Sequence, residues 1–429
     1  MSRVLFTAGR VIDPVAGTSR RLDVLVEDDR IAAVGPRLGP LTGVERIDCR
    51  DCFIAPGFLD LHCHLREPGR EEAETIASGA RAALMSGFTQ VCAMPNTEPP
   101  IDSEALVRFV SRRSEDAGFA RVLPVGCCTK GRQGRELAEL GAMRTAGAVA
   151  FSDDGNWVEN AGLMRRVLEY AKTFDTVVMS HCELAALASG TANESPVATR
   201  LGLRGNPWPA EAAAVARDVM LAELTGSRLH VCHVSCAATV EVIRWAKARG
   251  VAVTAETCPH YLVLTDSALE SFDSNLRVNP PLRTEADRRA LVAGIADGTI
   301  DCLATDHAPH PAETKAVEFD NAASGIIGFE TAFSLLYELL VLKNHLTLPG
   351  LVTRLSTVPA RILGLDAPAV AEGAEANLAV IDPAATWVFD RSQVLSQSCN
   401  SPFLGRTMRG RVRVAMLGTT LLRQDDRQA

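Results

Sequence analysis

The feature that most limits how this chain can fold is a regular alternation of short apolar runs with longer amphipathic segments. Strand-like runs lie at Phe58–His64, Phe88–Met94, Arg121–Cys128, Gly147–Ser152, Thr176–Ser180, Arg228–Val234, Val251–Glu256 and Ile300–Thr305. Helix-like segments follow them at 71–86, 102–117, 134–146, 160–173, 209–225, 236–249, 284–297 and 328–342. Because parallel strands need crossover helices, eight such units in series predict an α/β fold that closes into a (β/α)8 TIM barrel. A doubly wound open sheet is the alternative, and the regularity of the units disfavours it.

The two ends of the chain have a different pattern. Residues 1–55 show strand alternation with turn signals and no helical period, and the alternation returns in runs such as 377–383 and 411–418. Neither end has enough strands for a stable sheet of its own. We therefore predict one small β-domain built from both termini, residues 1–55 and 359–429, beside a barrel that spans residues 56–358.

Composition excludes several classes of protein. Of 429 residues, 47% are hydrophobic and 22% charged, which is enough apolar material for a large core and atypical of a disordered chain. The formal charge of −8 and the absence of basic runs argue against binding to nucleic acid or to an anionic membrane. The sequence has no apolar run near the roughly 20 residues that span a bilayer, and it does not begin like a signal peptide. We expect a cytoplasmic protein.

The twelve cysteines are expected to be free thiols, because the sequence has no export signal. Cys49 and Cys52 form a lone C-x-x-C motif, and no second pair follows at the spacing of a zinc ribbon. Buried cysteines of this kind behave as small hydrophobic residues.

His62-Cys63-His64 ends the first predicted barrel strand and is the strongest local motif. Side chains alternate along a strand, so both imidazoles point to the same side, and such pairs bind zinc and similar metals. A lone H-x-H motif is weak evidence. Its position strengthens it, because the active sites of barrel enzymes lie at the carboxyl ends of the strands.

Other ligand-type residues follow the same rule of position. They are Asp153-Asp154 after the fourth strand, His181 after the fifth, His233 near the end of the sixth and Asp306 after the eighth. Taken singly, each has a structural explanation: a hydrogen-bonded core histidine, an Asp-Asp-Gly turn or a helix cap. Their convergence on one rim favours a metal site. The remaining histidines are expected to be structural: His230, His260, His307 and His345.

Four histidines and two carboxylates exceed what one tetrahedral zinc ion takes. They suit two metal ions about 3.5–4 Å apart that share one carboxylate and one hydroxide. The expected reaction is hydrolysis of an amide-like bond, with an aspartate transferring a proton to the leaving nitrogen. Spacing alone does not decide whether Asp153 or Asp154 is the shared ligand.

Further polar residues on this rim point to the substrate. Arg66 directly follows the H-x-H motif, and its guanidinium suits bidentate binding of a carboxylate. Asn96, Asn279 and His310 supply donors from the loops after strands 2, 7 and 8. Together they predict a small anionic substrate that carries an amide. The alternative for Arg66 is a surface salt bridge with Glu67 or Glu71.

The motifs together resemble those of the dihydroorotases of the class I bacterial type, in the amidohydrolase superfamily. The matching segments are HCHLREPG (62–69), MPNT (94–97), FSDDG (151–155), SHCE (180–183), HVS (233–235), NPPLR (279–283) and ATDHAPH (304–310). The resemblance covers nearly the whole chain, including the split β-domain. It implies a metal-dependent hydrolase of cyclic amide C–N bonds. The implied reaction is the reversible zinc-dependent cyclisation of N-carbamoyl-L-aspartate to (S)-dihydroorotate plus water, in de novo pyrimidine (UMP) biosynthesis.

The resemblance also implies roles for individual residues and a cofactor of two Zn²⁺ per subunit. One zinc ion would be held by His62, His64 and Asp306 and the other by His181 and His233, with Asp154 as the bridge in place of the carboxylated lysine of many relatives. Asp306 would be the general acid/base. Arg66, Asn96 and His310 would bind the α-carboxylate, while Asn279 and the backbone near Gly325 would contact the ring. Many family members have Ala-Pro-Phe-Gly where this chain has Ala322-Ala323-Ser324-Gly325. A homodimer and a complex with aspartate carbamoyltransferase are the implied assemblies.

Two alternative functions remain at this point. A hydantoinase or allantoinase would share the barrel and the metals, but its usual bridging lysine is missing, and HLREPG followed by MPNT fits the carboxylate of dihydroorotate better. A non-catalytic dihydroorotase-like subunit of an aspartate carbamoyltransferase complex would have lost metal ligands, and this chain keeps all of them.

Overall fold

The computed structural model describes residues 3–39 and 41–425, and its centre is a sheet of eight parallel strands. In chain order these strands are β6 (Phe58–Cys63), β7 (Phe88–Ala93), β8 (Arg121–Gly126), β9 (Ala150–Phe151), β10 (Val177–Ser180), β13 (Leu229–Val231), β14 (Val253–Thr257) and β15 (Cys302–Leu303). Each strand pairs with the next one in this order. The sheet is therefore wound in a single direction, as in a barrel.

The first and last strands close the barrel through the segment that follows β15. Cys63 and His307 form a parallel bridge, and the amide of His64 donates to the carbonyl of His307 at 2.8 Å. This nearly closed sheet confirms the predicted TIM barrel and excludes the open-sheet alternative. The strands are shorter than predicted, and β15 covers two residues of the expected Ile300–Thr305. Beyond β15, the amide of Thr305 donates to the buried carboxylate of Asp60 at 2.9 Å and not to a backbone carbonyl.

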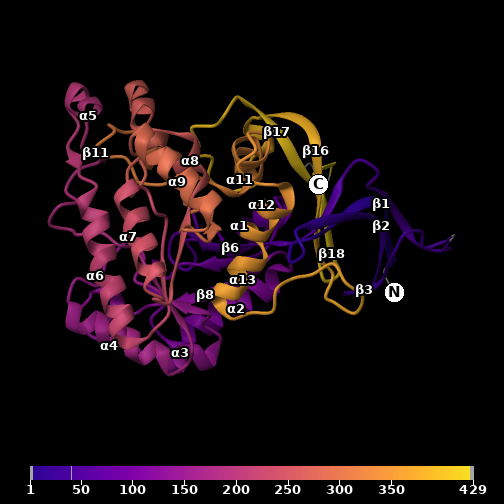
Figure 1. The fold of residues 1–429 in the computed structure, drawn as a ribbon, viewed down its shortest axis with the longest axis horizontal. Helices are drawn as coiled ribbons and strands as arrows, with labels where there is room; N and C mark the ends of the chain where they lie inside the picture. Colours follow the sequence, from indigo (N-terminus) through magenta and orange to yellow (C-terminus); the bar gives the residue numbers. More distant parts are fainter. Residues whose placement is uncertain (1–2, 40, 426–429) are drawn as a thin grey trace.

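Helices cover the outside of the barrel (Figure 1). The crossover helices are α1 (Ile76–Met85), α2 (Glu104–Ala117), α3 (Leu140–Ala146), α4 (Ala161–Lys172), α6 (Pro209–Thr225), α7 (Ala237–Ala248), α9 (Glu285–Asp297) and α11 (Phe329–Leu336), and α11 continues as a π-helical turn over Tyr337–Val341. Several begin at residues that favour helix starts, since Thr75 and Thr284 form capping boxes and Asn160 caps α4.

Shorter elements lie in the connecting loops. They are β11 (Ala192–Asn193), α5 (Pro196–Leu201), β12 (Gly205–Asn206), α8 (Pro259–Val263) and α10 (Ala312–Lys315), followed after the last barrel helix by α12 (Leu348–Leu355) and α13 (Thr357–Leu363). Ile362 and Leu363 of α13 pack against Leu59 and Leu61 of β6 in one buried cluster. The proposed domain boundary between residues 358 and 359 falls inside α13 and stays a prediction, as does the boundary at 55/56.

Both ends of the chain build a second, mixed sheet. Its strands are β1 (Arg3–Asp13), β2 (Thr18–Glu27), β3 (Arg30–Gly35), β4 (Glu45–Asp48), β5 (Phe53–Pro56), β16 (Asn377–Phe389), β17 (Arg406–Leu417) and β18 (Thr420–Arg423). In Figure 1 the indigo and yellow strands lie side by side on one flank of the barrel. The two halves join where Ile54 pairs with Val380. This confirms the predicted small β-domain from both termini.

Phe58 begins β6 at the junction between barrel and terminal sheet. Its ring is fully buried and packs at 5.5 Å, edge to face, on Phe88 and at 5.8 Å, stacked, on Phe333. Gly87 lies beside it with φ +95°, and an added Cβ there would come within 3.0 Å of both Phe58 and Val412 of β17. Glycine therefore lets β17 approach the start of the barrel.

Two further expectations concern the cysteines and membrane-spanning segments. All twelve cysteines are free thiols, and all except Cys399 are buried. Among the described residues, no helix is both long and apolar enough to cross a membrane.

Replacing Phe58 with alanine is expected to lower the free energy of unfolding by about 3–5 kcal/mol, because a fully buried aromatic ring leaves a cavity at the junction. The control is Phe109→Ala on α2, where the ring is 37% exposed and the expected loss is below about 1 kcal/mol. Urea unfolding followed by circular dichroism measures both. Equal losses in the two variants would show that the junction is not held by this cluster.

Candidate active site

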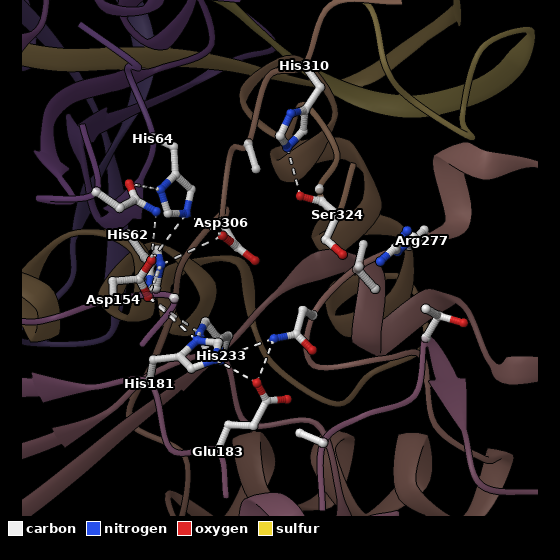
Figure 2. A pocket seen from close by; sticks show the side chains of 18 of the residues that line it. His62, His64, Asp154, His181, Glu183, His233, Arg277, Asp306, His310 and Ser324 are labelled. Atoms are coloured by element: carbon white, nitrogen blue, oxygen red, sulfur yellow. Dashed lines mark hydrogen bonds and ion pairs between the residues drawn. The ribbon is translucent and has the colours of Figure 1, made fainter. Parts of the chain in front are cut away.

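The carboxyl ends of the barrel strands surround a cavity of about 370 Å³. Every candidate site residue from the sequence lines it: His62, His64, Arg66, Asn96, Asp154, His181, His233, Asn279, Asp306, His310 and Gly325. Figure 2 shows the ligand-type side chains gathered on one side of this cavity, with His310 and Glu183 at opposite ends. The structure thus brings together residues from β6 to the loop after β15.

Asp154 lies at the centre of the imidazole cluster. Its Oδ1 is 3.2 Å from Nε2 of His62, 3.7 Å from Nε2 of His233 and 3.8 Å from Nδ1 of His181. Its Oδ2 is 3.7 Å from Nε2 of His64. One carboxylate therefore faces four imidazoles, a position that is compatible with a ligand shared between two ions.

Asp153 points the other way. Its carboxylate accepts from the amides of Cys128 at 2.9 Å and Thr129 at 3.1 Å and from the Thr129 hydroxyl, all in the loop after β8. The spacing in the sequence left Asp153 and Asp154 equivalent, and in the structure only Asp154 faces the histidines. Through these hydrogen bonds Asp153 instead anchors the loop after β8.

Asp306 completes the cluster from the end of β15. Its Oδ1 lies 3.1 Å from Nε2 of His64 and 3.7 Å from Nε2 of His62. Asp306 and His233 both have positive φ, +47° and +36°. Such backbone is unfavourable for residues with a Cβ and concentrates at functional sites, where it aims a side chain that a relaxed strand end would not.

The donor set fits a divalent metal ion. The ligand atoms of His62, Asp154 and His233 lie within 4.8 Å of one another, and so do those of His62, His64 and Asp306. Nε2 of His62 and Oδ1 of Asp154 are buried yet lack a well-aligned hydrogen-bond partner among the described residues. Buried polar atoms without partners are costly, and imidazole and carboxylate ligands suit zinc and similar ions.

The charge state of the carboxylates supports the same conclusion. Burial by itself would raise the pKa of Asp154, but the nearby imidazoles of His62, His233 and His64 lower it well below its usual value. Burial likewise opposes ionisation of Asp306, and a hydrogen bond from His64 with the charges of the nearby imidazoles lowers its pKa. Both groups are carboxylates at neutral pH, as metal ligands must be.

Each ligand histidine except His233 has a partner on its other ring nitrogen. Nδ1 of His62 is 2.9 Å from Glu256, Nδ1 of His64 is 2.9 Å from Oδ1 of Asn96, and Nε2 of His181 is 3.5 Å from Glu183. These partners fix the ring orientation and tautomer of a metal-ligating histidine. Asn96 thus serves His64 in this structure, with its amide nitrogen 3.4 Å from Asp154.

Arg66 supplies the positive charge at one end of the cavity, beside the imidazole of His310, which is neutral because burial lowers its pKa to about 3. The guanidinium of Arg66 donates to the carbonyl of Pro309 at 3.1 Å, and its Nη2 lies 3.2 Å from Nε2 of His310. Arg66 is buried, and Glu67 pairs instead with Arg113 at 2.6 Å. The surface salt bridge considered for Arg66 is therefore absent from the described residues.

Gly325 and Asn400 shape the wall beside that end. Gly325 has φ +142°, and a Cβ there would lie 2.6 Å from that of Ala308. Its amide donates to the carbonyl of Arg277, and its carbonyl accepts from Asn400. Asn400, from the segment between β16 and β17, also donates to Ala308 and accepts from the amide of His310. The backbone of Gly325 is therefore already engaged within the protein.

The histidines expected to be structural have varied surroundings. His230 lies 3.1 Å from Glu256, and the ring of His307 stacks on Phe329 at 4.0 Å. His260 is buried, and its Nε2 has no hydrogen-bond partner among the described residues. Together with Cys258 and Asp306 it forms a group of side chains close enough to hold a metal ion. Burial lowers its pKa to about 4, so its imidazole is neutral.

Sequence reasoning assigned no role to two acidic residues of the site, Glu183 and Glu256. Glu183 belongs to the SHCE motif, two residues after His181, and lines the cavity. Glu256 lies near the end of β14, where the rule of strand ends would have found it. Each contacts a ring nitrogen of a candidate ligand histidine, Glu256 that of His62 and Glu183 that of His181. The spacing of the ligand residues in the sequence does not reveal such contacts.

Comparisons with known proteins agree with one another. A family model described as Dihydro-orotase-like matches residues 52–239. A dihydroorotase of Pelobacter propionicus is 49% identical over 408 residues, covering 95% of this chain and 96% of that protein. One from Anaeromyxobacter dehalogenans is 48% identical over 429 residues, covering 99% of each. Among solved structures, the L-hydantoinase of Arthrobacter aurescens superposes with a TM-score of 0.87 at 24% identity, covering 99% of this chain and 96% of that one. This last likeness concerns the fold alone.

Replacing Asp154 with asparagine is expected to reduce the metal bound per chain at least about twofold, because the carboxylate between the four imidazoles is lost. The matched control is Asp153→Asn, which removes the neighbouring carboxylate and should keep the metal while lowering thermal stability. Mass spectrometry of metal content after dialysis against zinc measures the effect. Loss of metal from the Asp153 variant alone would reverse the two assignments.

Proposed function

The chain belongs to the dihydroorotase family, and we propose that it catalyses the reversible ring closure of N-carbamoyl-L-aspartate to (S)-dihydroorotate plus water, in de novo pyrimidine biosynthesis. The enzyme is a hydrolase of cyclic amide C–N bonds in the direction of ring opening. The observation that carries the proposal is near-full-length similarity to dihydroorotases, combined with a cavity that holds both a ligand cluster and a buried arginine.

The proposed cofactor is two Zn²⁺ per subunit. His62, His64 and Asp306 would hold one ion, His181 and His233 the other, and Asp154 would be the shared ligand. Support comes from the position of Asp154 between these imidazoles. Bound there, the metal ions would supply a hydroxide at neutral pH and polarise the amide carbonyl.

Asp306 is the proposed general acid/base. Its Oδ1 is engaged by His64, which leaves Oδ2 facing the cavity for a proton. During ring opening this carboxylate would accept the proton of the attacking water and return it to the leaving ring nitrogen. Ring closure is the same transfer in reverse.

Arg66, His310 and Asn96 are proposed to bind the α-carboxylate of the substrate, with Asn279 and Gly325 beside the ring. The guanidinium of Arg66 is held by the carbonyl of Pro309, so it is fixed before the substrate arrives. Asn96 retains one N–H for the substrate while its oxygen serves His64.

The proposal extends to the setting of the enzyme. We propose a cytoplasmic homodimer that also associates with aspartate carbamoyltransferase, as the family resemblance implies. Sedimentation of the purified chain, alone and with that enzyme, tests both assemblies. A single monomeric species in both runs would contradict them.

The ring-opening activity is tested by following the ultraviolet absorbance of dihydroorotate with zinc-loaded and chelated protein. We expect loss of dihydroorotate by the loaded protein, abolished by chelation and restored by zinc. Hydantoin and allantoin serve as parallel substrates. Turnover of one of these rings in place of dihydroorotate would overturn the substrate, and a zinc-loaded protein without any turnover would favour a non-catalytic subunit.

Replacing Arg66 with methionine should raise the KM for dihydroorotate about 10- to 100-fold, since a charge-assisted bond of about 1.5–3 kcal/mol is lost. The control is Arg113→Met, which removes a partly exposed guanidinium paired with Glu67 and should leave KM unchanged. Steady-state kinetics measure both variants. An unchanged KM for the Arg66 variant would refute its role at the carboxylate.

A further inference from the structure

Glu183 is an acidic residue that faces the cavity and that the proposed reaction does not use. It follows His181 by two residues in the loop after β10, and its side chain is 19% exposed. Figure 2 shows it at the opposite end of the cavity from His310. A carboxylate in a pocket for an anionic substrate needs a reason to be there, because like charges repel.

Three side chains approach this carboxylate. Oε2 accepts from the amide nitrogen of Asn279 at 3.1 Å and lies 3.5 Å from Nε2 of His181. Oε1 accepts from the amide nitrogen of Asn206 at 3.1 Å. A carboxylate only accepts hydrogen bonds, so each of these groups must turn an N–H toward Glu183.

For His181 this contact favours the tautomer with the proton on Nε2 over the one in which Nε2 accepts from the amide of Asn279, 3.4 Å away. With its proton on Nε2 and facing Glu183, the lone pair of His181 lies on Nδ1. That atom is 2.9 Å from Nε2 of His233 and 3.8 Å from Oδ1 of Asp154. The free electron pair is therefore directed into the ligand cluster, as a metal ligand requires.

For Asn279 the contact decides which end of the amide meets the substrate. Its nitrogen is turned toward Glu183, so its oxygen is left as an acceptor for a donor in the cavity. The guanidinium of Arg66 lies at the other end, 3.2 Å from Nε2 of His310. The cavity thus offers a cation at one end and a hydrogen-bond acceptor at the other, which suits a ring with a carboxylate on one side and an N–H on the other.

Glu183 is itself held by Asn206, which other buried residues support in turn. Asn206, fully buried in β12, pairs in register with Asn193 of β11, and its carbonyl accepts from Arg283. Arg283 also donates to the side chain of Asn193 at 3.0 Å. The carboxylate is therefore held by Asn206, which is tied in turn to β11 and to the buried guanidinium of Arg283.

We propose that Glu183 is a positioning residue that orients both the metal ligand His181 and the substrate-facing amide of Asn279. The part of the inference that concerns Asn279 rests on the proposed function. The part that concerns His181 rests on the geometry of the candidate metal ligands alone. A single carboxylate then links metal binding to ring recognition, and either half can be measured separately.

The test exchanges the carboxylate at position 183 and the amide at position 279. Asn279→Asp sets two carboxylates against each other and should raise the KM for dihydroorotate at least about tenfold. Glu183→Gln lets the amide of Asn279 turn over and should raise KM by a similar factor. The double variant Glu183→Gln/Asn279→Asp restores one donor facing one carboxylate and keeps an oxygen toward the cavity. It should bring the KM most of the way back to the wild-type value.

Zinc retention provides a readout that does not depend on activity. Glu183→Gln should weaken zinc binding about 10- to 100-fold in competition with a chromophoric chelator. The double variant should regain retention, because the carboxylate placed at position 279 would lie near Nε2 of His181, where the Asn279 nitrogen is 3.4 Å away. Melting temperatures of the zinc-free variants report whether each one folds.

The outcomes separate the two proposals. If the double variant is no better than the worse single variant in both KM and zinc retention, the positioning role of Glu183 is overturned. If wild-type protein does not open dihydroorotate, the proposed function fails, while the zinc competition still decides the effect of Glu183 on His181. Unchanged KM and zinc retention in folded Glu183→Gln would likewise refute the inference.

Discussion

The structure of the active site depends on one electrostatic constraint, the close approach of four imidazoles to the buried carboxylate of Asp154. A buried charge is tolerated only with partners that balance it, and these rings come from β6 and from the loops after β10 and β13. The barrel makes this possible because it delivers the ends of distant strands to one rim. Behind the rings, Glu256, Asn96 and Glu183 fix their orientation.

The substrate end of the cavity depends on a part of the chain outside the barrel. Asn400 holds the carbonyls of Ala308 and Gly325 and the amide of His310, so the wall beside Arg66 is fastened to the segment between β16 and β17. The terminal sheet is thus more than an appended domain, because the conformation of the pocket relies on it. Some of the supports are shared with the imidazole cluster, because Glu183 contacts both His181 and Asn279.

The alternation of apolar runs was sufficient to predict the barrel, the shared terminal sheet and the rim that carries the ligand histidines. It could not give strand lengths, since the partner of the Thr305 amide just beyond β15 is the carboxylate of Asp60, which depends on tertiary contact. Nor could spacing distinguish Asp153 from Asp154, because the direction of a side chain after a strand is set by the loop that meets it. Asn400 lies far in sequence from the groups it orients, and no local pattern marks it, whereas the position of Glu256 near the end of β14 could have marked it as a candidate.

The pairing of β5 with β16 has a consequence for how the protein is made. Ile54 and Val380 are neighbours in the sheet but are far apart in the order of synthesis, and Asn400 follows later still. During translation β1, β2 and β3 can pair with one another early, but the edge of β5 must wait for β16, which leaves the ribosome near the end. The pocket wall is fastened only when that last segment arrives, so a nascent or truncated chain can carry every metal ligand and still lack a finished substrate site.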